Sequence, residues 1–193
     1  MVRTSIEVVS VRAGEERDED LVRELTGLWM AQRVDQGASP EAAARAVAEG
    51  RLREALRRCD VRAWLARLEE APVGYLIVSE NPFGLAPHPE VAIEQLFVDR
   101  RVRRRGVGHA LLDAVVAYAE RLGAEVVATH VPTQSRDANR FFARLGFGSV
   151  VVRRVVPTAT LRRKLHPEAK PELVAMLRRR RGLAPAPLRR PIG

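Results

Sequence analysis

The hydrophobic residues of this chain recur with two different spacings, which predict strands and helices in a clear order. Alternation and short apolar runs predict strands over residues 5–12, 61–68, 72–79, 91–98, 125–131 and 147–156. Helical spacing predicts helices over residues 15–29, 39–58, 106–122 and 135–145. The expected order is therefore β-α-α-β-β-β-α-β-α-β.

Local signals refine several of these elements. Ser39-Pro40-Glu41 supplies an N-cap, a proline in the first turn and an early acid, and Gly50 can break the helix that follows. The three consecutive strands over residues 61–98 predict an antiparallel meander. The helix between residues 91–98 and 125–131 predicts a crossover that leaves those two strands parallel. Residues 158–165 fit either a strand or a helical turn.

Charge is distributed unevenly along the chain. The net charge is +9, but residues 1–152 hold 21 Arg and 22 acidic residues, whereas residues 153–193 hold 12 basic and 2 acidic residues. The body is thus nearly neutral, and the basic segment lacks the interleaved aromatic residues typical of nucleic-acid binding. We therefore expect no nucleic-acid partner for the body, although a tail that binds RNA or DNA stays a competing hypothesis.

The remaining composition indicates a folded cytoplasmic protein. An apolar share of 46% is enough for a core, and no run reaches the roughly 20 apolar residues of a membrane span. The first 14 residues lack the pattern of a signal peptide. Cys59 is the single cysteine, which excludes an internal disulfide, and no metal site is expected.

One turn carries candidate chemistry. The segment Arg103-Arg104-Arg105-Gly106-Val107-Gly108 connects a strand to a helix, so free backbone N–H groups and a helix N-terminus meet there and favour an anion. A dinucleotide-binding fingerprint would follow the first strand and contain a third glycine, and a phosphate-binding P-loop would continue with Lys-Ser/Thr. By itself the pattern is also compatible with a solvated, arginine-rich helix start.

The turn in its context, IEQLFVDRRVRRRGVGHALL, resembles the Q/R-x-x-G-x-G/A turn of the GNAT superfamily of N-acetyltransferases, and RDANRFFARLGF resembles a later helix of that family. The resemblance covers roughly residues 5–156. It implies an α/β (α+β) domain over residues 1–156, with a mixed, mostly antiparallel sheet, splayed parallel central strands and flanking helices. Residues 157–193 would be a basic, Pro/Arg-rich extension.

The resemblance also implies acetyl-CoA as cofactor, bound by main-chain groups at the splay and at the turn. Thr129 and Val131 would face the splay. The implied cofactor-binding residues are Phe97, Val98, Arg103, Arg104, Arg105, Gly106, Val107, Gly108, His109, Ser135, Asn139 and Phe142. Many family members have a tyrosine that protonates the departing thiolate where this chain has Phe142, and an asparagine where it has Ser135. This departure puts the identity of the general acid in doubt.

Amine acetylation requires a proton acceptor, because an alkyl ammonium has a pKa of about 10.4. Glu94 is the candidate general base, since Glu94, Leu96 and Val98 alternate by two and are expected to share one face of their strand. A structural role for Glu94 at the sheet surface is the alternative, and Glu90 and His130 are weaker candidates. The resemblance further implies that Trp29 and Phe83 lie near the acceptor; the alternative is that both are core residues.

The predicted function is acetyl transfer from acetyl-CoA to a primary amine of a small molecule or a protein, by direct attack on the thioester. The alternative is a catalytically weak acyl-CoA-binding module or sensor, favoured by Phe142. No membrane partner is expected. The family resemblance allows a homodimer.

Overall fold

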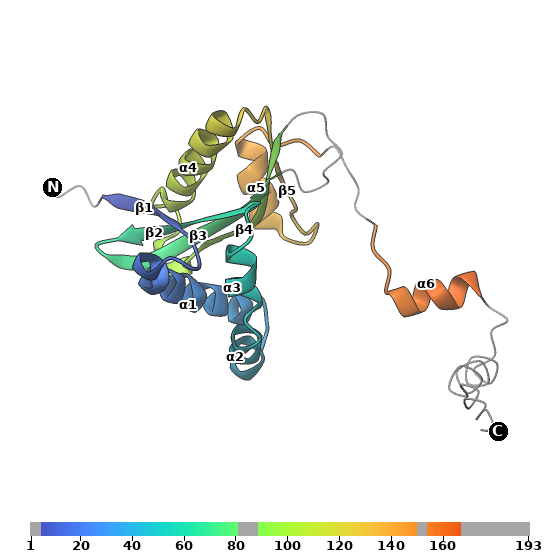
Figure 1. The fold of residues 1–193 in the computed structure, drawn as a ribbon. Coiled ribbons are helices and arrows are strands. Elements are labelled where there is room, and N and C mark those ends of the chain that lie inside the picture. Colours follow the sequence, from blue (N-terminus) through green and yellow to red (C-terminus); the bar gives the residue numbers. More distant parts are fainter. Residues whose placement is uncertain (1–4, 81–88, 150–153, 167–193) are drawn as a thin grey trace, which may run out of the picture. The chain divides into compact units, whose positions relative to one another are not determined.

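The fold is given by a computed structural model that describes residues 5–80, 89–149 and 154–166. The chain forms two compact units, Met1–Phe147 and Gly148–Gly193. The first unit contains a sheet with helices packed against it (Figure 1). A domain boundary after residue 156 stays a prediction. Within the described ranges, no helix is both long and apolar enough to cross a membrane.

The sheet has five strands in the order β1-β2-β3-β4-β5, which is also their order in the chain. They are β1 Ile6–Val11, β2 Val61–Leu68, β3 Ala71–Glu80, β4 Glu90–Val98 and β5 Val126–Thr129. The first four strands pair antiparallel, and β4 pairs with β5 in parallel. The predicted meander and the predicted parallel pair are both confirmed.

Helices cover both faces of the sheet. On one face lie α1 Glu19–Asp35, α2 Pro40–Ala48 and α3 Arg51–Leu56, and on the other lie α4 Val107–Leu122 and α5 Arg136–Arg144 (Figure 1). Two short 3-10 turns, Glu16–Asp18 and Arg100–Val102, precede α1 and α4. Ser39 caps α2, because its Oγ accepts a hydrogen bond from Ala42 N at 3.2 Å. Gly50, at φ 70°, separates α2 from α3, as expected.

The hydrophobic core therefore has two layers. Leu25, Trp29 and Leu56 pack under β2 and β3 on the α1–α3 face. On the opposite face Leu111 and Val115 of α4 pack against the sheet. The start of α4 is fixed to the sheet by this second layer, because Val107 is also buried there.

The predicted strand over residues 147–156 is wrong for its described ends. Residues 147–149 and 154–156 form no strand, and residues 150–153 lie outside the described part. A run of β-branched residues becomes a strand only where a neighbouring strand satisfies its backbone groups, and the described residues offer these ends no such partner. In the second unit, residues 158–165 form the helix α6 Thr158–Leu165, which settles the choice between strand and helical turn.

Candidate active site

A bulge divides β4 at Glu94. Ile77 of β3 pairs with Gln95, whereas the next residue, Val78, pairs with Ile93, so Glu94 has no partner in β3. An unpaired extra residue bends the strand and strengthens its twist. On the other side of β4, the parallel ladder with β5 ends at Ile93 and Thr129. The two parallel strands therefore separate at Glu94.

The bulge corrects the expected orientation of Glu94. Val91 and Ile93 pack on the α4 face, and so do Leu96 and Val98, which an uninterrupted alternation would not allow. Because the extra residue shifts the alternation, Glu94 lines a pocket on the α1–α3 face together with Gln95. The prediction that Glu94 shares a face with Leu96 and Val98 is thus wrong.

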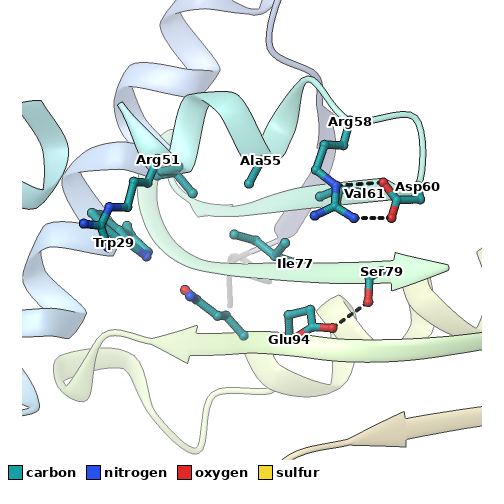
Figure 2. A pocket seen from close by; sticks show the side chains of 11 residues that line it. Trp29, Arg51, Ala55, Arg58, Asp60, Val61, Ile77, Ser79 and Glu94 are labelled. Carbon is teal, nitrogen blue, oxygen red and sulfur yellow. Dashed lines mark hydrogen bonds and ion pairs between the residues drawn. The ribbon is translucent and has the colours of Figure 1, made fainter. Parts of the chain in front are cut away.

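The pocket next to Glu94 measures about 510 Å³. Its walls come from α1, α3, β2, β3 and β4, and Figure 2 shows their side chains converging on one space. The lining residues are Trp29, Arg51, Leu52, Ala55, Arg58, Asp60, Val61, Ile77, Ser79, Glu94 and Gln95. Trp29, which was expected near the acceptor, lines this pocket, while Phe83 lies outside the described residues.

The Glu94 carboxylate is held by one hydrogen bond. Ser79 Oγ donates to Glu94 Oε1 at 2.5 Å (Figure 2). No described residue donates a hydrogen bond to Glu94 Oε2, which leaves that oxygen available to water or to an amine. Sequence reasoning missed Ser79; the signal was its position in β3, on the same face as Ile77 and opposite the start of the meander's last strand.

The turn over residues 103–108 follows β4 and leads into α4. Gly106 is the N-cap of α4 and adopts φ 89°, a left-handed conformation that favours glycine. Within the described residues, the N–H groups of Gly106 through His109 have no hydrogen-bond acceptor, and the first internal bond of the helix is Ala110 N to Gly106 O at 3.0 Å. Arg105 N instead donates to Val102 O at 3.4 Å.

The arginines of the turn are exposed. Arg103 Nε donates to Val98 O at 3.2 Å, and Arg104 adopts φ 65°. Unsatisfied N–H groups, the positive end of the helix dipole and three exposed guanidinium groups all favour an anion. The N–H groups of residues 106–109 therefore fit the pyrophosphate of coenzyme A, whereas the N–H of Arg105, which was also expected to bind it, already donates to Val102 O.

Phe141 lies against this turn, and sequence reasoning missed it. A Cβ atom on Gly108 would come within 3.3 Å of the Phe141 ring, so glycine lets the turn approach α5 closely. The Phe141 and His109 rings meet edge to face with centroids 5.8 Å apart. Two adjacent phenylalanines in RDANRFFARLGF were the signal, but helical spacing alone did not show which one faces the turn.

Phe142 points into the core instead. Its side chain is buried, and its ring packs edge to face on Phe141 and Phe147, with centroids 5.2 and 5.1 Å away. Asn139 stabilises the start of α5, since its Nδ2 donates to Pro132 O at 3.0 Å and to Ser135 O at 2.8 Å. The Ser135 side chain makes no cap hydrogen bond and is half-buried.

The strand residues expected at the splay are Phe97, Val98, Thr129 and Val131. Phe97 is buried on the α1–α3 face, and its ring centroid lies 5.9 Å from that of Tyr75. Burial raises the pKa of the Tyr75 phenol. Thr129 and Val131 are half-buried, and Thr129 Oγ1 donates to Ile93 O at 3.5 Å. Beyond Ile93 no described strand covers the edge of β4 that faces away from β3. Apart from Val98 O, which accepts from Arg103 Nε, the main-chain groups of β4 that point away from β3 are thus open there.

Comparison with known proteins agrees with this arrangement. Residues 22–147 match the model of the acetyltransferase (GNAT) family. The chain is 31% identical over 93 residues to the uncharacterized N-acetyltransferase MJ1207 of Methanocaldococcus jannaschii, and 32% identical over 96 residues to the uncharacterized N-acetyltransferase YafP of Escherichia coli. These matches cover 48% and 50% of this chain, and 41% and 59% of those two proteins.

Solved structures show the same fold. The aminoglycoside N-acetyltransferase AAC(6′)-Iy in complex with CoA superimposes with a TM-score of 0.63 at 17% identity, over 80% of this chain and 95% of that one. The chain belongs to the acetyltransferase (GNAT) family, a family of acetyl-CoA-dependent N-acetyltransferases. The predicted family and fold are confirmed.

Proposed function

We propose that this chain transfers an acetyl group from acetyl-CoA to the primary amine of a small molecule bound in the pocket beside Glu94. The observation that supports it most is the position of Glu94. Its bulge lies at the point where β4 and β5 separate, and its carboxylate lines the pocket on the α1–α3 face. A carboxylate that can accept a proton thus lies between the opening expected to hold the pantetheine arm of acetyl-CoA and a pocket for the amine substrate.

The cofactor would be held mainly by backbone. The free N–H groups of residues 106–109 would bind the pyrophosphate, and the exposed arginines at 103–105 would add charge. Main-chain groups near Phe97 and Val98 would pair with the pantetheine arm along the open edge of β4, with Ser135 as a further hydrogen-bond partner. Phe141 would flank the turn, with Phe142 behind it.

Acetyl-CoA supplies an acetyl group activated as a thioester. The chain must supply a neutral amine, because an alkyl ammonium with a pKa of about 10.4 has no free electron pair at neutral pH. Glu94 Oε2 would accept the amine's proton, directly or through a water, while the hydrogen bond from Ser79 holds the other carboxylate oxygen. Phe142 has no proton to give, so the thiol, with a pKa of about 8.5 as in cysteine, would leave as a thiolate.

The variant Glu94→Gln tests this assignment. Glutamine keeps the shape and can still accept from Ser79, but it cannot take a proton, so kcat/KM with an accepted amine should fall about 10²- to 10⁴-fold. Binding of acetyl-CoA, measured as a rise in the unfolding temperature, should be retained. Glu120→Gln, on an exposed position of α4, is the matched control and should keep the activity.

A catalytically weak acyl-CoA-binding module is the alternative, and the buried, hydroxyl-free Phe142 is the observation that favours it. The same experiment separates the two. Acetyl-CoA binding combined with equally slow turnover in the parent chain and in Glu94→Gln would favour the module.

A further inference from the structure

The pocket beside Glu94 is not an acidic one. Its charged lining residues are Arg51, Arg58, Asp60 and Glu94, whose formal charges cancel. The wall formed by α3 and the turn after it is basic, because residues 51–58 contain four arginines and one glutamate. A pocket for a polycationic amine would need an excess of carboxylates to compensate the charge it desolvates. This pocket offers one carboxylate that is not already ion-paired, Glu94.

The two arginines of the pocket differ in how firmly they are held. Arg58 binds Asp60 with both arms of its guanidinium, at 2.9 and 2.5 Å, and this neighbour raises the Arg58 pKa. Arg51 makes a single contact with Glu49 at 2.8 Å, in which the Arg51 side chain is 77% exposed. Exposed single ion pairs of this kind contribute little to the free energy of folding, so Arg51 can exchange Glu49 for another anion at a small cost in stability.

The positions of these groups fit a particular ligand. Figure 2 shows Arg51 near Trp29 at one side of the pocket, Glu94 with Ser79 at the other, and Ile77 between them. Leu52 and Ala55 add further apolar surface to the lining. An acceptor that spans the pocket would thus meet a carboxylate, an apolar stretch and the Arg51 guanidinium, whose one ion pair is with Glu49, in turn.

We propose that the acceptor carries an anionic group, a carboxylate or a phosphate, in addition to its amine, and that Arg51 binds that group. This rests on the proposed function, since the amine must lie at Glu94. Arg51 then determines specificity rather than chemistry. A guanidinium suits either anion, because its planar fork donates two parallel hydrogen bonds to carboxylate or phosphate oxygens.

Matched pairs of amines test the proposal with the full chain and acetyl-CoA, with thiol release as the readout. ε-Aminocaproate is compared with ε-aminocaproamide, and O-phosphoethanolamine with ethanolamine; spermidine represents polycations. The anionic member of at least one pair should have a kcat/KM higher by about tenfold, the contribution of one charge-assisted hydrogen bond. The pair that shows the difference identifies carboxylate or phosphate.

Two arginine variants complete the experiment. Arg51→Gln should bring the ratio between anionic and neutral amines close to one, mainly through KM. Arg57→Gln, an exposed arginine of the same segment that does not line the pocket, should keep the ratio. The proposal is overturned if neutral amines or spermidine react as well as the anionic ones, or if Arg51→Gln leaves the ratio unchanged. Absence of turnover with every amine would instead overturn the proposed function, and this inference with it.

Discussion

Gly74 joins the sheet to the start of α4, and replacing it should loosen both. Gly74 lies in β3 opposite Val98. A Cβ atom at this position would lie 2.8 Å from the Phe97 carbonyl oxygen, 3.2 Å from Val107 Cγ1 and 3.4 Å from Leu111 Cδ1. The first distance is too short for any carbon and involves backbone, so β4 would have to move. The other two atoms belong to buried residues of α4.

The size of the effect follows from two opposing contributions. Forcing a methyl group into a packed core costs about 1–3 kcal/mol. Replacing glycine by alanine also restricts the unfolded chain, which returns about 0.4–1 kcal/mol. Gly74→Ala should therefore lower the free energy of unfolding by roughly 1–2 kcal/mol, or the unfolding temperature by about 2–8 °C in a protein of this size.

Thermal unfolding with and without acetyl-CoA measures both consequences. Because β4 leads into the turn over residues 103–108 and Val107 is part of it, the stabilisation by acetyl-CoA that we propose for this turn should also shrink in Gly74→Ala. Gly27→Ala is the control: Gly27 is an exposed position of α1 with no atom within 4 Å of the added Cβ, so this variant should be more stable by about 0.5–1 kcal/mol. Equal stability of Gly74→Ala and the parent chain would refute the reasoning.

Two further changes probe the turn and the pH dependence. Gly106→Ala should lower stability by about 1 kcal/mol and weaken acetyl-CoA binding, because alanine is strained at φ 89°; binding by calorimetry that matches the parent chain would contradict this. Burial, helped by the hydrogen bond to Glu80, raises the pKa of Tyr118 from 10.0 to about 12. Because the phenol ionises at lower pH in the unfolded chain, the contribution of Tyr118 to the free energy of unfolding should be complete below about pH 10 and fall towards pH 12. Tyr118→Phe should reduce this fall, measured by urea denaturation. An unchanged pH profile in Tyr118→Phe would contradict the role of Tyr118.

Much of the fold could be predicted because its signals are local. Period-two and period-3.6 spacing placed β1 to β4 and α4. Gly50 marked a helix end that the structure contains, and the helix predicted to end at residue 122 ends at Leu122. The turn at Arg103–Gly108 was recognisable because a strand, two glycines and a helix follow in order. Unsatisfied N–H groups occur at such a helix start whatever its side chains are. Predicting the start of the helix therefore also predicted a backbone site for an anion.

What could not be predicted depends on contacts between distant segments. The bulge at Glu94 arises from the pairing of β4 with β3, and no pattern within residues 90–98 indicates it. The choice between Phe141 and Phe142 depends on how α5 rotates against α4. Residues 147–149 and 154–156 carry a β-rich composition, but a strand requires a partner that composition does not supply.

The bulge in β4 has a consequence for how robust the opening is. Its geometry comes from the number of residues between Ile93 and Gln95, not from the side chain that occupies the extra position. Point substitutions at Glu94 should therefore change the chemistry at the point where β4 and β5 separate, while the separation itself persists. Removing the residue would bring both halves of the strand back into phase and let its outer edge continue along β5. The length of β4, more than its composition, thus determines where its pairing with β5 stops.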